Sequence, residues 1–257
     1  MKADNRDLTV KIDGENISRG CRVRLRGAAG LSLYPALWTA EILNLSDSGR
    51  GALRTGKEVV LLREGAELAR GSIQEVQQLP SGSGGAWTVF GFSLGLDLWE
   101  AEIALSAEAG HTPEELIRRT LEASGTPWRL LNPLPPGPVF SRGWALSGRA
   151  GELIETLLAS AGVRGCLTPS GLIAVSPSAP VQAELSEADL TDQPVRTRGR
   201  LILPTRPAGW PVGRRIRLSF RGRETTGLIL RRSVDADTLS GPWNSQLLIE
   251  PDPFPGS

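Results

Sequence analysis

Two stretches of the sequence, far apart along the chain, share one layout and decide the fold. The first reads Gly56-Lys57-Glu58-Val59-Val60-Leu61, followed by Gly65 and then Gly71-Ser72-Ile73. The second reads Gly213-Arg214-Arg215-Ile216-Arg217-Leu218, followed by Gly222 and then Gly227-Leu228-Ile229. In each, a glycine turn starts a strand, a second glycine reverses the chain, and the return strand passes through a third glycine. The third glycine is displaced by one residue between the copies. The pattern predicts a small β domain that is duplicated at the two ends of the chain.

Neighbouring segments also read as strands. Residues 21–26 alternate with period two, which puts three arginines on one face and Val23 and Leu25 on the other. Residues 80–85 read Pro-Ser-Gly-Ser-Gly-Gly and predict a flexible connection, and residues 87–92 are rich in β-branched and aromatic side chains. We expect a long hairpin here.

The middle of the chain follows a helical pattern instead. Thr112 can cap a helix, Pro113 suits its first position, and Glu115 completes a capping box. An apolar face follows, and Gly125 suits the position after the helix end. A second amphipathic helix is expected at residues 149–161, ended by Gly162.

A proline-rich stretch at residues 132–138 predicts an extended linker between these helices. After the second helix, residues 165–168 and 172–175 flank Pro169-Ser170-Gly171 in the manner of a hairpin. The whole pattern predicts an α+β, mainly β fold. Its expected regions are a first β domain at 1–100, a middle region with two helices and a linker at 101–190, and a second β segment at 191–257 that partly repeats the first.

Composition limits the functions to consider. The chain has 257 residues, 40% of them hydrophobic, and its 29 basic and 28 acidic side chains nearly cancel, so no global basic field marks it as a nucleic-acid binder. No signal peptide and no membrane-spanning run is visible, so we expect a soluble chain made in the cytoplasm, with no membrane binding by itself. Cys21 and Cys166 lie outside any metal or disulfide pattern and are expected to be buried or half-buried.

The order of these motifs resembles a known family. A glycine-launched strand is followed by the return strand Ala69-Arg70-Gly71-Ser72-Ile73, then by helices containing Thr112-Pro113-Glu114-Glu115-Leu116-Ile117 and Glu152-Leu153-Ile154, and then by Gly171-Leu172-Ile173-Ala174-Val175. This order is similar to that of the phage baseplate hub family, also described as late-control protein D-like, of contractile tails. The likeness covers about residues 10–250.

The resemblance implies two tail-tube-like β domains in each chain and a homotrimeric ring, in which three chains present six similar modules. Such a ring connects the tail tube to the central spike and surrounds the channel for the tape-measure protein and DNA during ejection. The implied partners are the chain itself, a tail tube or distal tail protein, a spike protein and the tape-measure protein. The implied location is the virion tail baseplate, assembled in the host cytoplasm. On this basis the repeated hairpins line the channel or pair with neighbouring subunits.

A catalytic interpretation finds little support in the sequence. The single histidine, His111, precedes a helix cap and lacks any triad or metal-ligand pattern, and Glu114 and Glu115 are explained by capping and the helix dipole. A carboxylate pair for glycoside hydrolysis has no support in the spacing of the acids, which are Glu41, Asp47, Asp97 and Glu100. We therefore predict no enzyme activity, no cofactor and no metal site.

Two features keep other functions open. Residues 196–232 hold eleven arginines against the single acid Glu224, as in an OB-like nucleic-acid-binding fold, although sequence-specific binding is not expected. Seven tryptophans against one tyrosine raise a carbohydrate-binding β-sandwich. We favour subunit contacts for both features, and Trp210 and Trp243 stand beside prolines that suit exposed loops. The predicted interface residues are Arg214, Arg215, Arg217, Arg221, Arg223, Trp210 and Trp243.

Overall fold

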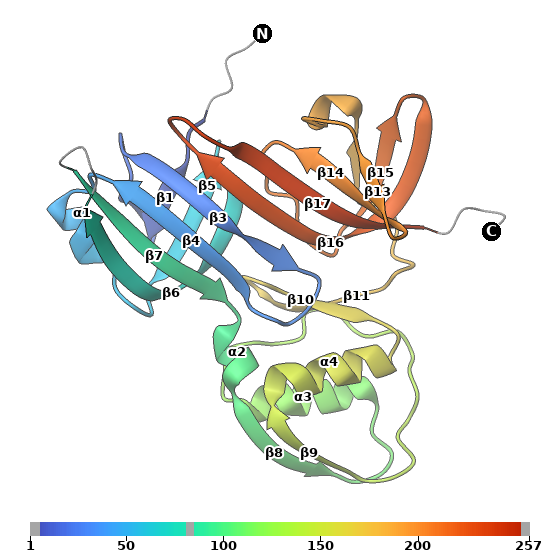
Figure 1. Cartoon of the computed structure of the whole chain (residues 1–257). Coiled ribbons are helices and arrows are strands. Elements are labelled where there is room, and N and C mark those ends of the chain that lie inside the picture. Colours follow the sequence, from blue (N-terminus) through green and yellow to red (C-terminus); the bar gives the residue numbers. More distant parts are fainter. Residues whose placement is uncertain (1–5, 81–84, 253–257) are drawn as a thin grey trace. The chain divides into compact units, whose positions relative to one another are not determined.

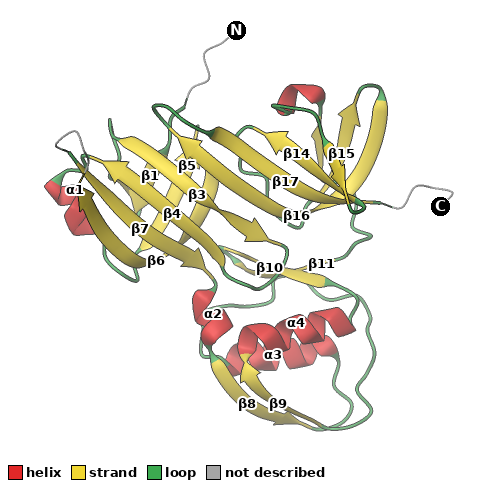
Figure 2. Ribbon diagram, in the orientation of Figure 1, coloured by secondary structure: helices red, strands yellow, loops and turns green. Residues whose placement is uncertain are grey.

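The computed structural model describes residues 6–80 and 85–252 and is mainly β, which confirms the predicted fold class (Figures 1 and 2). The chain forms two compact units. The first contains residues 1–29, 36–93 and 181–257, and the second contains residues 30–35 and 94–180. The middle region therefore begins at Leu94 and ends at Pro180, which differs from the expected range of 101–190.

The first unit contains two groups of strands. We name them the first repeat and the second repeat. The first repeat consists of β1 (Thr9–Ile12), β2 (Glu15–Asn16), β3 (Arg22–Gly30), β4 (Ala36–Leu43), the short helix α1 (Asp47–Ala52), β5 (Glu58–Arg63), β6 (Ala66–Pro80) and β7 (Ala86–Leu94). The second repeat consists of β12 (Ala183–Leu185), the 3-10 turn η1 (Glu187–Asp189), β13 (Val195–Thr197), β14 (Arg200–Thr205), β15 (Arg215–Phe220), β16 (Arg223–Asp237) and β17 (Trp243–Pro251).

All these strands belong to one 13-stranded sheet, and the two repeats occupy it in the same order. The first repeat runs β3-β4-β7-β6-β5-β1, and the second runs β13-β14-β17-β16-β15-β12. One hydrogen-bonded pair, β16 with β3, joins the repeats. The repeats differ at their last strand, because β1 pairs antiparallel with β5 whereas β12 pairs parallel with β15.

The two hairpins that the glycine pattern marks as equivalent have the same geometry. Arg63 lies opposite Ala66 in β5–β6, and Phe220 lies opposite Arg223 in β15–β16. Both two-residue turns have positive φ at each position, 49° and 82° at Glu64 and Gly65, and 49° and 72° at Arg221 and Gly222. This is the type I′ turn that suits the twist of a hairpin.

A β-bulge explains why the third glycine is displaced by one residue. In the first hairpin the register shifts between Leu61 and Leu62, so Leu68 is an extra residue on β6. The second hairpin has no such shift. Beyond the bulge the repeats agree again, because Ile73 exchanges hydrogen bonds with the start of β5, donating its N–H to the Lys57 carbonyl, as Ile229 does to that of Arg214. Ile73 and Ile229 are therefore equivalent positions.

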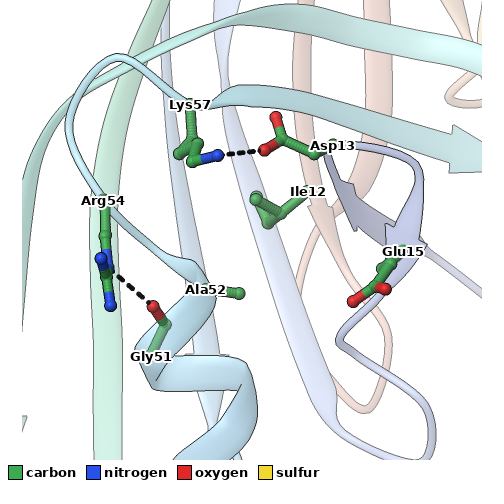
Figure 3. A pocket seen from close by; sticks show the side chains of 7 residues that line it. All are labelled: Ile12, Asp13, Glu15, Gly51, Ala52, Arg54 and Lys57. Carbon is green, nitrogen blue, oxygen red and sulfur yellow. Dashed lines mark hydrogen bonds and ion pairs between the residues drawn. The ribbon is translucent and has the colours of Figure 1, made fainter.

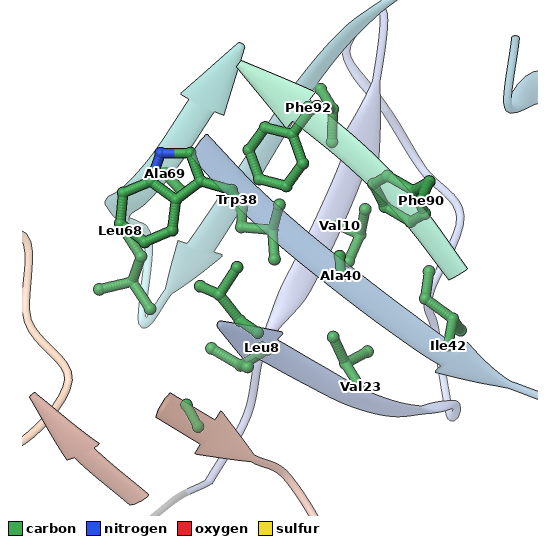
Figure 4. Packing of buried hydrophobic residues seen from close by; sticks show 14 of the residues in the cluster. Leu8, Val10, Val23, Trp38, Ala40, Ile42, Leu68, Ala69, Phe90 and Phe92 are labelled. Atoms are coloured by element: carbon green, nitrogen blue, oxygen red, sulfur yellow. The ribbon is translucent and has the colours of Figure 1, made fainter. Parts of the chain in front are cut away.

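The strands of the first repeat enclose the larger of two hydrophobic cores in this unit. Alternate residues of each strand point inward, among them Val10, Val23 and Phe90, and all three are fully buried. Figure 4 shows Trp38 of β4 beside Phe92 of β7, with the two rings stacked at 6.4 Å between centroids. The second repeat has a smaller core, made of Leu185, Leu203, Ile216, Leu218, Ile229, Leu247 and Ile249.

The second unit holds the helices. Its elements are α2 (Leu96–Glu100), β8 (Glu102–Ala107), α3 (Pro113–Ala123), β9 (Trp144–Arg149), α4 (Ala150–Ser160), β10 (Arg164–Thr168) and β11 (Gly171–Val175). The capping box of α3 is confirmed: Thr112 accepts a hydrogen bond from the Glu115 N–H at 3.3 Å, and the Glu115 carboxylate accepts one from the Thr112 N–H at 2.8 Å. Both predicted helices and the β10–β11 hairpin are confirmed.

The remaining local predictions concern the proline-rich stretch, the β6–β7 hairpin and the two cysteines. The proline-rich stretch at 132–138 forms neither helix nor strand, and the long β6–β7 hairpin is confirmed. Residues 81–84 of its predicted flexible connection lie outside the described residues. Cys166 is buried and Cys21 is half-buried, as expected.

Candidate subunit interface

The pair of strands that joins the two repeats, β3 and β16, shows how this fold connects one β module to the next. We name this contact the internal joint. The Thr238 N–H donates to the Val23 carbonyl at 3.0 Å, and in this register the arginines on one face of β3 meet aspartates of β16. Arg22 and Arg24 contact Asp237 at 2.6 and 2.7 Å, and Arg26 contacts Asp235 at 3.2 Å.

Asp237 is the centre of this ladder. The residue is only 3% exposed, and it accepts hydrogen bonds from Arg22, Arg24 and the N–H groups of Leu239 and Ser240. Burial alone raises the pKa of a carboxyl group, but these donors together hold the pKa of Asp237 well below its usual range. Asp237 is therefore ionised at neutral pH and holds β3 against β16.

Buried Arg232 and half-buried Arg63 complete the internal joint on its other face. Arg232 of β16 is 8% exposed and donates to the carbonyls of Leu68 and Ala208. Burial lowers the pKa of Arg232 to about 10, so the group stays charged at neutral pH. Arg63, at the end of β5, donates to the Pro207 carbonyl at 2.5 Å and lies over the Trp243 ring at 5.4 Å.

The half of β16 that contacts β3 is buried in the core of the first repeat. Val234 and Ala236 are 3% and 0% exposed and pack with Leu8, Val10 and Val23. Trp243 of β17 belongs to the same cluster. The second repeat thus supplies residues that close the core of the first.

No strand among residues 6–80 and 85–252 covers the corresponding half of β6 in this way. Ile73 and Ile229 are equivalent, and in both strands the register shifts directly after this residue. Counting onward from them, Val76 corresponds to Arg232 and Leu79 corresponds to Asp235. All of residues 74–80 are exposed, with Val76 at 36% and Leu79 at 47%. We name residues 74–80 the β6 overhang.

The outer edge of the second repeat is open in the same sense. The segment from Leu190 to Thr197, which we name the β13 edge, lies beside β14 in the position that β3 takes beside β4. Val195, in this edge, is 54% exposed. A hollow of about 240 Å³ lies next to this edge and is lined by Glu187, Leu190, Thr191, Asp192, Gln193, Phe220 and Arg221.

The predicted interface residues fall into distinct environments. Arg214, Arg221 and Arg223 are exposed, the last two at the tip of the β15–β16 hairpin. Arg215 pairs with Asp252, and Arg217 pairs with Glu184 at 3.1 Å, so both are partly neutralised within the chain. Trp210 is half-buried against the smaller core.

The predicted exposed position of Trp243 is wrong. The residue is 6% exposed and begins β17, where it packs in the core of the first repeat. Its neighbour Pro242 does mark a turn, but the next residue already points inward. Of the seven tryptophans, Trp38 and Trp243 are buried and the other five are half-buried.

Three of the four acidic residues considered for catalysis have partners of other kinds. Glu41 pairs with Arg24, Asp47 with Arg50, and Asp97 accepts a hydrogen bond from Trp128. Glu100 ends α2 and is exposed, and the His111 Nδ1 lies 3.4 Å from a Glu115 carboxylate oxygen. The described residues contain no group of three His, Cys, Asp or Glu side chains that could hold a metal ion.

A second hollow, of about 390 Å³, lies beside α1 (Figure 3). Its charged side chains neutralise one another in part, because the Lys57 Nζ lies 2.5 Å from an Asp13 oxygen. The hydrogen bond from Lys57 lowers the pKa of Asp13, so this ion pair persists at neutral pH. No helix in the described part of the chain is long and apolar enough to cross a membrane.

Sequence reasoning missed the residues of the internal joint. The alternating arginines at 22, 24 and 26 are visible in the sequence, and so are the alternating acids Asp235 and Asp237. The sequence analysis did not predict that these two segments pair with each other. The matching alternation of opposite charges is a signal that could have indicated it.

Solved structures described as tail proteins share the fold of this chain. A tail protein from Neisseria meningitidis MC58 matches with a TM-score of 0.68 and 11% identity, over 95% of this chain and 96% of that one. The 43 kDa tail protein of prophage MuSo2 from Shewanella oneidensis matches with a TM-score of 0.64 and 10% identity, over 95% and 96% of the two chains.

A third similar structure comes from a secretion system. The E. coli c3393 protein, described as a component of the type VI secretion system with structural similarity to T4 tail proteins gp27 and gp5, matches with a TM-score of 0.66 and 9% identity, over 95% of this chain and 77% of that one. Neither protein-family models nor curated protein sequences match this chain. The predicted resemblance to tail hub proteins is confirmed at the level of the fold.

Proposed function

We propose that this chain is a structural subunit of a phage tail baseplate hub. In this proposal it forms a homotrimeric ring that connects the tail tube to the central spike and surrounds the channel for the tape-measure protein and DNA. The observation that carries the proposal is that a strand contact formed once within the chain has an equivalent whose two surfaces are unpaired in the described residues. The internal joint is made, whereas the β13 edge and the β6 overhang are both open.

Open strand edges invite pairing with another chain. The two open surfaces lie on different repeats, so a contact between them is head-to-tail, and a head-to-tail contact generates a ring when its rotation closes. Three copies then present six modules with alternating internal and external joints. Such a ring has true threefold and approximate sixfold symmetry, which suits a subunit placed between a sixfold tube and a threefold spike.

The proposal assigns the chain no chemistry, and three of the four candidate carboxylates, those of Glu41, Asp47 and Asp97, are used in local contacts. Its partners are further copies of itself, the tail tube or distal tail protein, the spike and the tape-measure protein, in the virion tail. The exposed arginines Arg214, Arg221 and Arg223 belong to subunit contacts in this proposal. The comparison structures support it through the fold that they share with this chain.

Light scattering of the purified chain over a range of concentrations tests the ring. We expect a species of about three times the 27.5 kDa chain mass, formed alone or on mixing with candidate tail-tube and spike proteins. A chain that stays monomeric at high concentration, with and without those proteins, would contradict the proposal. Binding of oligonucleotides by such a monomer would favour the OB-like alternative.

A further inference from the structure

We propose that the β6 overhang of one copy pairs with the β13 edge of a second copy, in the register that β16 adopts on β3 within the chain. This inference rests on the proposed ring and names the surfaces that build it. Its basis is the equivalence of the two repeats, which allows the internal joint to serve as a template. The template specifies residue by residue which side chains meet between copies.

The register of the external contact follows from the strand pairings. A row of residues that lie opposite one another on successive strands begins at Val195. Val195 lies opposite Ile202, Ile202 lies opposite Leu248, and Leu248 lies opposite Arg231. In the first repeat the same row starts at Arg26 opposite Thr39, passes through Gly91 and ends at Glu75, which is the residue equivalent to Arg231. The β4–β7 step is fixed by the Asn44 N–H, which donates to the Ala86 carbonyl at 3.0 Å.

Val195 is therefore equivalent to Arg26, and Leu79 is equivalent to Asp235. Inside the chain Arg26 and Asp235 form an ion pair. Between copies the template places Val195 against Leu79, two residues that are 54% and 47% exposed in the single chain. An exposed ion pair in one joint is thus replaced by two exposed apolar side chains in the other.

Apolar residues also stand at the positions equivalent to Arg232 and Arg63. Val76 stands where Arg232 stands, and Phe220 ends its strand where Arg63 ends β5. Phe220 also lines the hollow beside the β13 edge. Four charged groups of the internal joint, which are Arg26, Asp235, Arg232 and Arg63, therefore have apolar equivalents on the open surfaces, as expected for a contact that buries apolar area between chains.

The occupant of the hollow is thus a second copy of this chain. The β13 edge has no neighbouring strand on its outer side among the described residues. The β6 overhang offers a strand of matching length, with an open backbone edge and exposed apolar side chains.

Cysteine cross-linking between two different variants tests the register. One preparation carries Val195→Cys, the other carries Leu79→Cys, and both carry Cys21→Ser. Directly opposite residues on antiparallel strands have Cα atoms about 4.5–5.5 Å apart, which a disulfide spans. We expect a covalent dimer of two chains when the preparations are mixed and oxidised, and at least tenfold less of it from either preparation alone.

A second test disrupts the contact without touching the core. The double variant Val76→Glu, Leu79→Glu places charge on the overhang, and Val139→Glu changes an exposed valine of the other unit as a matched control. We expect the double variant to raise the concentration needed for ring formation at least tenfold, while the control leaves it unchanged and both keep the wild-type circular dichroism.

The outcomes separate this inference from the proposed function. A wild-type ring that gives no mixed cross-link and tolerates the double variant would overturn the inference and leave the ring intact. A wild-type chain that forms no ring under any condition would overturn both.

Discussion

The internal joint and the two open surfaces are versions of one contact, and they differ in polarity. The internal joint contains half-buried Arg63, buried Arg232, the Asp237 ladder and an Arg26–Asp235 ion pair. The open surfaces carry Phe220, Val76, Val195 and Leu79 at the matching positions. A duplicated module has thus acquired two chemically different ways of meeting its neighbour.

Covalent connection explains why the internal joint can be polar. The two repeats belong to one chain, so their effective concentration is high and the contact needs little apolar driving force. A contact between separate chains must offset the lost translational and rotational freedom, and apolar burial is the main source of that free energy. Polar groups in the internal joint then fix its register in addition to stabilising it.

The largest contrast is expected between Arg232 and its equivalent Val76. Replacing Arg232 by alanine leaves the Leu68 and Ala208 carbonyls without their donor and opens a void, so we expect a loss of about 3–5 kcal/mol of unfolding free energy. Val76→Ala removes an exposed side chain and should cost less than about 0.5 kcal/mol in the single chain. Urea unfolding at low protein concentration measures both.

Similar losses for the two variants would contradict the comparison, because they would mean that Arg232 contributes no more than a surface residue. Arg231→Ala is the matched control, since Arg231 is the exposed neighbour on the same strand. Its effect should equal that of Val76→Ala within experimental error.

A smaller contrast is expected between the two aspartates of the ladder. Asp237→Asn keeps the side-chain shape but removes the charge that accepts from Arg22 and Arg24, so we expect a loss of about 2 kcal/mol. Asp235→Asn should lose less than about 1 kcal/mol, because its partner Arg26 has 57% of its side chain exposed. Equal effects in urea unfolding would show that Asp237 does not hold the joint.

The contribution of Asp237 should also depend on pH, with a sign set by its pKa. The folded pKa lies below the unfolded value of about 4, so the stabilisation is complete above that value and is lost as the pH falls toward the folded pKa. We expect the stability gap between wild type and Asp237→Asn to stay constant from about pH 7 to 5 and to shrink below about pH 4. A gap that already shrinks between pH 7 and 5 would contradict this assignment.

Local signals in the sequence were sufficient for several elements. Thr112, Pro113 and Glu115 define the start of α3 because capping depends on neighbouring residues alone. Gly65 and Gly222 mark the two hairpin tips because a type I′ turn needs positive φ. The equivalence of the two hairpins followed from these glycines, and the bulge at Leu68 accounts for the single offset.

The contacts that define the candidate interface depend on distant residues. The pairing of β3 with β16 joins Arg22 to Asp237, 215 positions away, and no local pattern specifies a partner at that range. Trp243 was misplaced for the same reason, since its burial depends on residues of the first repeat. The sequence shows alternation within each strand, but only the folded chain shows which alternating faces meet.

The smallest expected effects should be equal and therefore sharpen the equivalence of the repeats. Gly65→Ala and Gly222→Ala each place a side chain at positive φ, and a Cβ built at either position meets nothing within 4 Å. The cost is then only that of the left-handed backbone, about 1 kcal/mol in each hairpin. Gly51→Ala, in α1, serves as the control, because its Cβ also meets nothing and a helix favours alanine. Urea unfolding that gave clearly unequal losses for the two hairpin variants would show that the turns differ in environment, and it would weaken the template on which the contact between copies rests.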